Sequence, residues 1–291
     1  MSGDRDATPG VSPANGVGSR VGRDLKPRIV SGVVLAAAVL AITLAGVLPF
    51  AALMAVIGAV IAWEWGRIVR GLDADVVMAA HAGAVIAAVA LAVAALPGLS
   101  LLAIAIGMIL VALLSFGRHS VLSATGVAYA GLPAVALIWL RADEPLGAHA
   151  VLFVILIVAL ADTAAYFSGR LIGGPKLWPS VSPNKTWAGL IGAITAGAVG
   201  GALAALWIVG ASRPGLALLG AGLALVAQGG DLAESALKRR FGTKDASTLI
   251  PGHGGFMDRV DGIVAAGVAA AVVGGLINVQ APAHALLLAT W

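Results

Sequence analysis

Long apolar stretches without regular polar alternation follow one another along most of the chain. About 20 apolar residues are needed for a helix to cross the hydrocarbon core of a bilayer. The pattern predicts nine such spans, at 29–47, 49–65, 76–96, 99–116, 121–140, 148–168, 186–209, 215–233 and 262–287. A transmembrane barrel would instead show short strands in which apolar and polar residues alternate. The predicted fold is therefore an all-α, polytopic membrane bundle of about nine helices.

The composition supports this fold class. Mean hydropathy is +1.00 and 11% of the residues are charged, whereas about 25% is usual in soluble domains. The chain has no cysteine, which excludes disulfides and thiolate metal sites. Residues 1–28 are polar and lack large apolar clusters, so we expect a disordered cytoplasmic tail there. We further expect N-terminal transmembrane helices at 29–140 and a C-terminal transmembrane catalytic region at 141–291.

The basic residues predict an orientation. Sixteen of the 18 Lys and Arg fall in one set of alternate connecting segments, and only Arg141 and Arg213 fall in the other. By the positive-inside rule, the N-terminus and the charged motifs should face the cytoplasm. All seven Trp lie near predicted span ends, as they would in an interfacial aromatic belt. Glu64 lies between Trp63 and Trp65, and we take a position in this belt as the main explanation for a charged residue there. Asp143 and Glu144 are expected in a solvated outer loop.

Candidate chemistry concentrates between Asp231 and Asp261. This segment holds 10 of the 32 charged residues, five acidic and five basic. Asp231, Glu234, Ser235 and Lys238 are spaced to form one stripe on a helix. The stripe is either a functional surface at the end of a span or an internally paired helix face. Gly229 and Gly230, just before it, would allow a second helix or a ligand to approach the backbone closely.

A second pair of carboxylates follows a glycine-rich turn. Asp258 and Asp261 lie one helical turn apart after Pro251-Gly-His253-Gly-Gly. Acidic residues at a helix start also complement its dipole, which could account for Asp261 alone. Mg²⁺ prefers oxygen ligands and usually binds through one or two carboxylates together with substrate phosphates. Asp231 and Asp258 could supply these carboxylates from neighbouring helices, and His253 is a secondary candidate for a phosphate contact.

A third cluster surrounds the sixth predicted span. Asp162, Tyr166 and Gly169 share one helix face, and Asp162 lies within an apolar stretch, where it needs a partner or a cavity. In the loop that follows, Ser182, Lys185 and Thr186 have the composition of a phosphate cradle at a helix N-terminus. Helix capping and a topology signal explain much of the same pattern. Farther on, Gly192, Ala196 and Gly200 are spaced for close helix packing.

Two segments give a family resemblance. Ser235-Ala-Leu-Lys238-Arg239, Lys244-Asp245 and Pro251-Gly-His253-Gly-Gly-Phe-Met-Asp258-Arg259-Val-Asp261 resemble the C-terminal signature of the phosphatidate cytidylyltransferase (CDP-diacylglycerol synthase) family. Ser182-Pro-Asn-Lys-Thr-Trp-Ala-Gly189 resembles a second family segment, with Asn184 and Ala188 where the family usually has Lys and Glu. The resemblance covers about residues 160–262.

The resemblance implies a helical membrane enzyme, often a homodimer. With the orientation that the basic residues predict, its active site would face the cytoplasm, and a short polypeptide of this kind suits a bacterial inner membrane. CTP and phosphatidic acid would be its substrates, and no nucleic-acid partner is expected. Mg²⁺ at Asp231 and Asp258, with a monovalent cation alongside, would be its metals. Catalytic roles are expected for Asp231, Asp258, Lys244 and Asp261. Substrate binding is expected for Ser182, Lys185, Thr186, Ser235, Lys238, Arg239, His253 and Arg259.

Two other functions fit parts of the pattern. A CTP-dependent lipid kinase acting on a polyprenol or phytol would also need metal and phosphate-binding groups, together with a base near the alcohol. An anion transporter could use Asp162 and Asp231 within the membrane. Its usual marks are repeat symmetry and polar residues near the middle of several spans, and here the polar residues gather at one edge.

Overall fold

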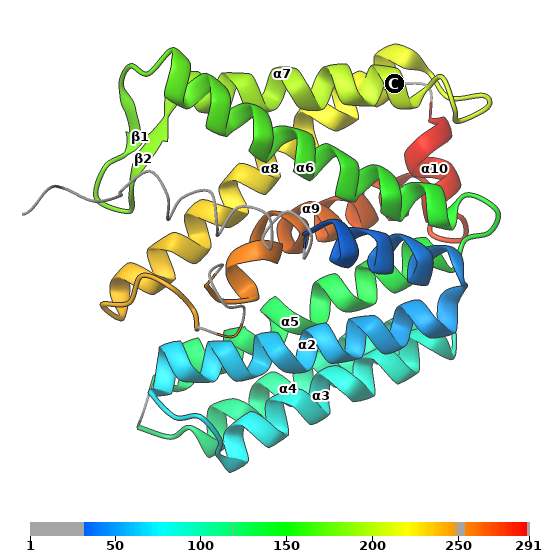
Figure 1. Cartoon of the computed structure of the whole chain (residues 1–291). Coiled ribbons are helices and arrows are strands. Elements are labelled where there is room, and N and C mark those ends of the chain that lie inside the picture. Colours follow the sequence, from blue (N-terminus) through cyan, green and yellow to red (C-terminus); the bar gives the residue numbers. More distant parts are fainter. Residues whose placement is uncertain (1–31, 118, 248, 250–253, 290–291) are drawn as a thin grey trace, which may run out of the picture. The chain divides into compact units, whose positions relative to one another are not determined.

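The computed structural model of the chain describes residues 32–117, 119–247, 249 and 254–289. By its internal contacts the chain divides into two units, Met1–Val39 and Leu40–Trp291. Of the first unit the structure describes residues 32–39, which belong to a short apolar helix, Gly32–Leu44. The other described elements lie in the second unit (Figure 1). The predicted disordered tail, 1–28, falls outside the described residues.

Among the described residues, eight helices are long and apolar enough to cross a membrane. They are α2 (Val47–Arg70), α3 (Val76–Val93), α4 (Pro97–Leu114), α5 (Ser120–Arg141), α6 (Gly147–Leu171), α7 (Trp187–Ala204), α8 (Arg213–Arg240) and α9 (Met257–Ile277). The prediction of a polytopic helical membrane protein is confirmed. The first predicted span, 29–47, begins outside the described residues, and its described part is the short helix Gly32–Leu44.

The last predicted span, 262–287, was wrong in extent. Helix α9 ends at Ile277, Asn278 is extended, and a separate short helix, α10 (Pro282–Leu288), packs back against α9. Asp143 fixes the start of α10, because its Oδ2 accepts the backbone N–H groups of Ala283 and His284 at 2.8 and 2.9 Å. The expectation of a solvated Asp143 was therefore also wrong: its side chain is 10% exposed and bonds the start of α10.

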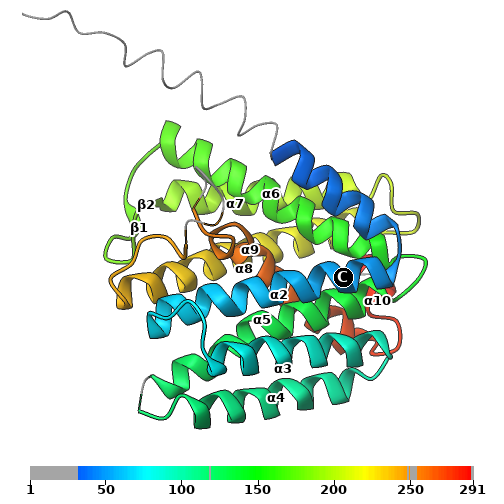
Figure 2. The same cartoon turned by 60° about the horizontal axis from the view of Figure 1, so that its bottom comes forward.

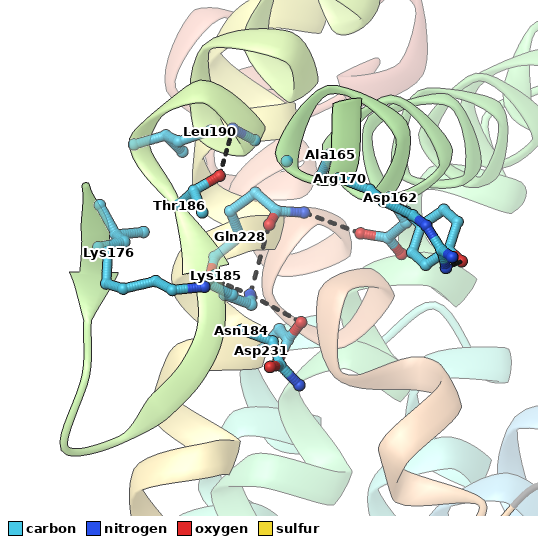
Figure 3. A pocket seen from close by; sticks show the side chains of 14 residues that line it. Asp162, Ala165, Arg170, Lys176, Asn184, Lys185, Thr186, Leu190, Gln228 and Asp231 are labelled. Carbon is cyan, nitrogen blue, oxygen red and sulfur yellow. Dashed lines mark hydrogen bonds and ion pairs between the residues drawn. The ribbon is translucent and has the colours of Figure 1, made fainter. Parts of the chain in front are cut away.

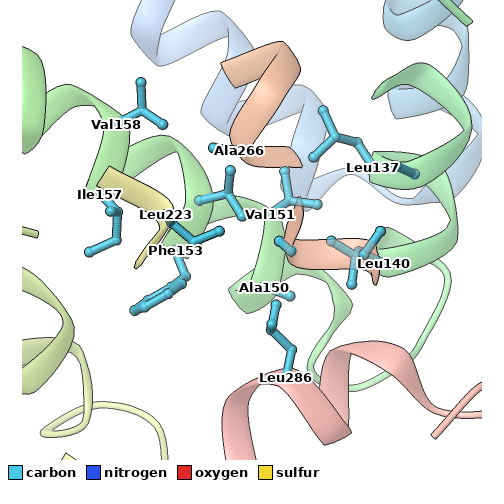
Figure 4. Packing of buried hydrophobic residues seen from close by; sticks show 14 of the residues in the cluster. Leu137, Leu140, Ala150, Val151, Phe153, Ile157, Val158, Leu223, Ala266 and Leu286 are labelled. Carbon is cyan, nitrogen blue, oxygen red and sulfur yellow. The ribbon is translucent and has the colours of Figure 1, made fainter. Parts of the chain in front are cut away.

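The helices of the second unit pack through two sets of neighbours. Helices α2, α3 and α5 contact one another, α4 packs against α3 and α5, and α7 packs against both α6 and α8 (Figure 2). Helix α9 joins the sets, since it contacts α5, α6 and α8. Leu137, Val151, Ile157, Leu223 and Ala266 belong to the apolar cluster at this junction (Figure 4). Burying such side chains stabilises the bundle around α9, the helix that carries Asp258 and Asp261.

Small residues let α7 lie close to both of its neighbours. Gly192 and Gly200, two of the residues whose spacing predicted close packing, face α6, where a Cβ on Gly200 would lie 2.5 Å from the Leu160 side chain. Gly201, which faces α8, was not part of that prediction. A Cβ on Gly192 would come within 2.1 Å of Ser168 Oγ on α6, and one on Gly201 within 1.9 Å of the Leu216 carbonyl oxygen on α8. Any larger side chain would force these helices apart. The glycines therefore serve packing within this chain.

The segment between α6 and α7, expected to be a loop, forms a hairpin. Strand β1 (Lys176–Trp178) pairs antiparallel with β2 (Ser182–Thr186), with Lys176 opposite Thr186. Gly173 and Gly174 precede it with φ of 68° and 92°, a backbone region that favours glycine. The hairpin lies at the same end of the bundle as the end of α8 (Figure 1).

Trp65 does not belong to an interfacial belt, contrary to the expectation from its position. It is 6% exposed, its indole N–H donates to the Leu122 carbonyl at 2.7 Å, and its ring lies 5.0 Å from that of Tyr129. A buried indole needs such a hydrogen-bond partner, and α5 supplies it. Trp65 therefore fixes α2 against α5 near the predicted site.

Candidate active site

Helices α8 and α9 touch where the acidic residues begin. A Cβ on Gly230 would lie 2.8 Å from the Asp261 carbonyl oxygen and 2.7 Å from the Ala265 side chain. The close approach expected at the glycine pair is thus made by α9 at Gly230. It brings the carboxylates of Asp231, Glu234 and Asp261 together, with one oxygen from each within 4.8 Å of the others.

Lys238 links the two helices one turn farther along. Its ammonium group donates to Glu234 Oε2 at 2.6 Å and to Asp258 Oδ1 at 2.5 Å. Glu234 and Lys238 are buried, and Glu234 Oε1 has no hydrogen-bond partner among the described residues. The internal pairing of Glu234 with Lys238 is therefore present, and the functional interpretation of the stripe stays a prediction. The unpartnered Oε1 of Glu234 belongs to the carboxylate that lies beside Asp231 and Asp261.

Asp258 faces Lys238 and the turn before α9. Its Oδ2 accepts the backbone N–H of Ala246 at 3.2 Å and that of Gly255 at 2.9 Å. This carboxylate therefore joins the end of α8, the segment after it and the start of α9.

A pocket of about 580 Å³ opens beside Asp231, between α6, the hairpin, α7 and α8 (Figure 3). Lys185 Nζ lies 2.7 Å from Asp231 Oδ2 and donates to Gln228 Oε1 at 3.3 Å. Gln228 Nε2 in turn donates to Asp162 Oδ1 at 2.8 Å. These bonds run from α6 through α8 to the hairpin, so they fix the positions of a carboxylate, an amide and an ammonium group along the pocket wall.

Two further cations and a helix start complete the lining. Arg170 and Lys176 line the pocket, and both are exposed. Thr186 is the N-cap of α7: its Oγ1 accepts the Gly189 N–H at 3.0 Å. Because this hydroxyl is already engaged with the backbone, Thr186 orders the start of α7 at the pocket edge.

The other predicted substrate-binding residues have varied surroundings. Ser235 Oγ donates to Asp231 Oδ1 at 3.3 Å, while Arg239 donates to the carbonyls of Val181 and Thr243 and so ties the hairpin to α8. Lys244 and Arg259 are exposed, Ser182 lies on β2, and none of these three lines the pocket. His253 lies outside the described residues. The structure therefore brings together Asp231, Lys185 and Thr186 at the pocket, and Lys238 with Asp258 beside it.

Two residues at this end of the bundle were missed or undervalued by sequence reasoning. Gln228 precedes Asp231 by three residues in an apolar span, and that spacing on the same helix face was the available signal. Glu64 is fully buried and bonds Ser247, Phe256 and Met257. The cost of placing a carboxylate at membrane depth was its signal.

The donor set at α8 and α9 fits a hard divalent cation. Such ions take oxygen ligands, and three carboxylates converge here, one of them with an unpartnered buried oxygen. Lys185 and Lys238 already pair with Asp231 and Glu234, and a cation would neutralise the negative charge that the three carboxylates still carry together.

Comparisons with known proteins identify the family of the chain. The sequence profile of the cytidylyltransferase family matches residues 26–277. The chain is 51% identical over 143 residues to the phosphatidate cytidylyltransferase of Brucella suis biovar 1 (strain 1330), covering 49% of this chain and 53% of that protein. It is 40% identical over 168 residues to the phosphatidate cytidylyltransferase of Staphylococcus aureus (strain COL), covering 56% of this chain and 63% of that protein.

The fold and the site define a helical membrane protein with an acidic cluster beside a cation-lined pocket. The chain belongs to the cytidylyltransferase family, which confirms the family resemblance of its two motif segments. It spans about half the length of the Brucella relative that it matches.

Proposed function

We propose that this protein is a phosphatidate cytidylyltransferase, which converts CTP and phosphatidic acid into CDP-diacylglycerol and pyrophosphate. One observation carries the proposal: Lys185 bridges Asp231 of the acidic cluster to a pocket that Arg170 and Lys176 also line, between helices long enough to cross a membrane. Both substrates are polyanions, and one is a lipid. The names of the relatives support the same assignment.

The reaction needs charge neutralisation more than proton transfer. A phosphate oxygen of phosphatidic acid forms a bond to the α-phosphorus of CTP, and the bond from that phosphorus to the oxygen it shares with the β-phosphorus breaks, so that this oxygen leaves with pyrophosphate. The second pKa of a phosphomonoester is about 6, so the nucleophile is already ionised in the cytoplasm. No general base is required. The protein must instead hold two anions together and stabilise the negative charge that develops on pyrophosphate.

The cations of the site have distinct roles in this proposal. Lys185, Arg170 and Lys176 bind substrate phosphates in the pocket. Gln228 holds Lys185 beside Asp231, since it accepts from the ammonium group and is itself fixed by Asp162. Lys238 keeps Glu234 and Asp258 in place. Lys244, Arg239 and Arg259 stay predicted phosphate contacts from outside the pocket, as do Ser182, Ser235 and His253.

Asp231, Glu234 and Asp261 are the residues that would hold Mg²⁺. The ion would supply positive charge to the phosphate oxygens and so help two anions to approach. The role of Asp258 as a metal ligand stays a prediction. In the structure both of its carboxylate oxygens accept hydrogen bonds, from Lys238 and from two backbone amides. A monovalent cation nearby is part of the same proposal.

The cellular setting follows from the same chemistry. CTP is cytoplasmic, so the pocket should face the cytoplasm from a bacterial inner membrane, in agreement with the distribution of basic residues. The acyl chains of phosphatidic acid would stay in the bilayer while its headgroup enters the pocket. A homodimer is also part of the proposal.

Product analysis tests the proposed reaction. Purified protein in detergent would be given phosphatidic acid, CTP and Mg²⁺, and both pyrophosphate and lipid-linked cytidine would be measured. We expect the two products in equal amounts, and neither from the Asp231→Asn variant. In parallel reactions with a polyprenol or phytol in place of phosphatidic acid, CDP together with the phosphorylated alcohol would identify a lipid kinase instead. No chemical change with any of these lipids would favour the transporter.

A further inference from the structure

We propose that Glu64 of α2 is a positioning residue that fixes the start of α9, and through it the acidic cluster. Glu64 lies more than 180 residues before its partners in sequence. Its Oε1 accepts Ser247 Oγ at 2.5 Å and the Phe256 N–H at 2.8 Å, while its Oε2 accepts the Met257 N–H at 2.5 Å. With no exposed surface, this carboxylate is committed entirely to that end of α9.

Helix α9 depends on this contact because its own N-cap residue gives it none. The first N–H groups of any helix have no partner within the helix. Phe256, the N-cap residue, makes no side-chain capping bond in the described structure. Glu64, which belongs to α2, accepts hydrogen bonds from two of these N–H groups of α9. It also places negative charge at the positive end of the α9 dipole.

The surroundings of Glu64 are built for a close approach. A Cβ on Gly255 would lie 2.9 Å from Glu64 Oε1 and 2.7 Å from the Ala246 side chain. The absence of a side chain at Gly255 therefore lets the turn lie against the carboxylate. In the same turn the Gly255 N–H donates to Asp258. The turn is therefore fixed by two carboxylates, those of Glu64 and Asp258.

This contact controls where the acidic cluster sits. Asp258 lies directly after Met257 and pairs with Lys238, and Asp261 follows one helical turn later, within the cluster of Asp231 and Glu234. If Glu64 no longer held the first turn, that turn could shift or unwind, and both aspartates would move relative to α8. Glu64 touches neither the pocket nor the acidic cluster in the described structure, so it acts through α9.

The consequence for metal and turnover rests on the proposed function, so the test includes readouts that do not need turnover. Mn²⁺ binding to the purified protein would be measured by electron paramagnetic resonance, and hydrogen exchange would be followed across residues 254–258. The variants are Glu64→Ala, Glu64→Gln and, as a matched control, Asp75→Asn. Asp75 is a second mostly buried carboxylate attached to α2, through Arg70, but it bonds the start of α3.

We expect Glu64→Ala to weaken Mn²⁺ binding by about 10- to 100-fold, the range found when residues that orient metal ligands are removed. Exchange across 254–258 should rise, and kcat should fall more than the KM for CTP rises. Glu64→Gln should be intermediate, because its amide oxygen still accepts hydrogen bonds while its NH₂ group faces an N–H. Asp75→Asn should bind Mn²⁺ as the wild type does.

Wild-type Mn²⁺ affinity, within about twofold, in both Glu64 variants would overturn the proposal, as would a wild-type protein that binds no Mn²⁺. If Glu64→Ala fails to fold, Glu64→Gln decides by the same comparison. Failure of the proposed function has a different signature: the wild type would bind Mn²⁺ and still form no lipid-linked cytidine. The Mn²⁺ comparison between variants would then still decide the role of Glu64.

Discussion

Gly230 of α8 and Asp261 of α9 lie so close that a single added carbon on the glycine would come within 2.8 Å of the Asp261 carbonyl oxygen. This contact sets the distance between the two helices that carry the acidic cluster. The carboxylates of Asp231, Glu234 and Asp261 converge because the backbones converge. The close packing of α8 against α9 therefore determines the geometry of the acidic cluster.

A methyl group at position 230 should separate the helices and disperse the cluster. We expect Gly230→Ala to lower kcat/KM by at least about 100-fold, since small displacements of reacting groups have effects of this size. The adjacent Gly229→Ala is a matched control, because a Cβ there meets no described atom within 4 Å. Equal turnover in the two variants would show that the α8–α9 approach does not govern the site.

Removing the ammonium group of Lys238 should destabilise the fold. Glu234 and Asp258 would lose their shared partner, and breaking a buried ion pair costs about 3–5 kcal/mol. Thermal unfolding of Lys238→Met in detergent should therefore begin at a clearly lower temperature than that of the wild type. Arg240→Met, at an exposed position two residues on, should change it little. Similar shifts for both variants would contradict the structural role of Lys238.

The pocket wall should matter for substrate binding and less for stability. Lys185→Met removes a charged hydrogen-bond donor, an effect of about 1.5–3 kcal/mol, so kcat/KM for CTP should fall by roughly 10- to 150-fold. Gln228→Leu should give a smaller loss in the same direction, because it only holds Lys185. Arg213→Met, at the other end of α8, is the control. An unchanged kcat/KM for CTP in Lys185→Met would show that the pocket does not bind the substrate phosphates.

Stability should fall at low pH through Asp75, which caps α3. Burial alone would raise the pKa of Asp75, but the hydrogen bonds from Arg70 and the Met78 N–H outweigh it and hold the pKa below its ordinary value of 3.8. A lowered folded-state pKa means that the stabilisation is complete above the unfolded value and is lost as the pH falls through the folded one. The stability difference between wild type and Asp75→Asn should therefore be constant near neutral pH and shrink in strong acid. A difference that stays constant down to pH values well below 3.8 would contradict this assignment.

The sequence predicted the fold class and most helix positions because long apolar stretches have one main explanation. The break after Ile277 had one local signal, Pro282 at the start of α10. The sequence could not show that Asp143, more than 130 residues earlier than Asn278, bonds the start of that helix. Trp65 was misassigned for a similar reason. Its partner, the Leu122 carbonyl, comes from another helix and leaves no mark in the local pattern.

The candidate site was predictable where chemistry depends on spacing along one helix. Asp231, Ser235 and Lys238 form the expected stripe, and Gly230 allows the expected close approach. What spacing could not give was the pairing across helices. Lys238 bonds Asp258, and Lys185 reaches Asp231 from the hairpin, because tertiary packing brings these groups together.

The most direct measurement of the central claim uses CTP labelled in turn at its α- and γ-phosphorus, with phosphatidic acid, Mg²⁺ and the purified protein. Transfer of CMP should place the α-label in the lipid and the γ-label in pyrophosphate, and Asp231→Asn should abolish both. A γ-label in the lipid would contradict the account and indicate a kinase. An α-labelled lipid formed equally well by Asp231→Asn would contradict the assignment of the site.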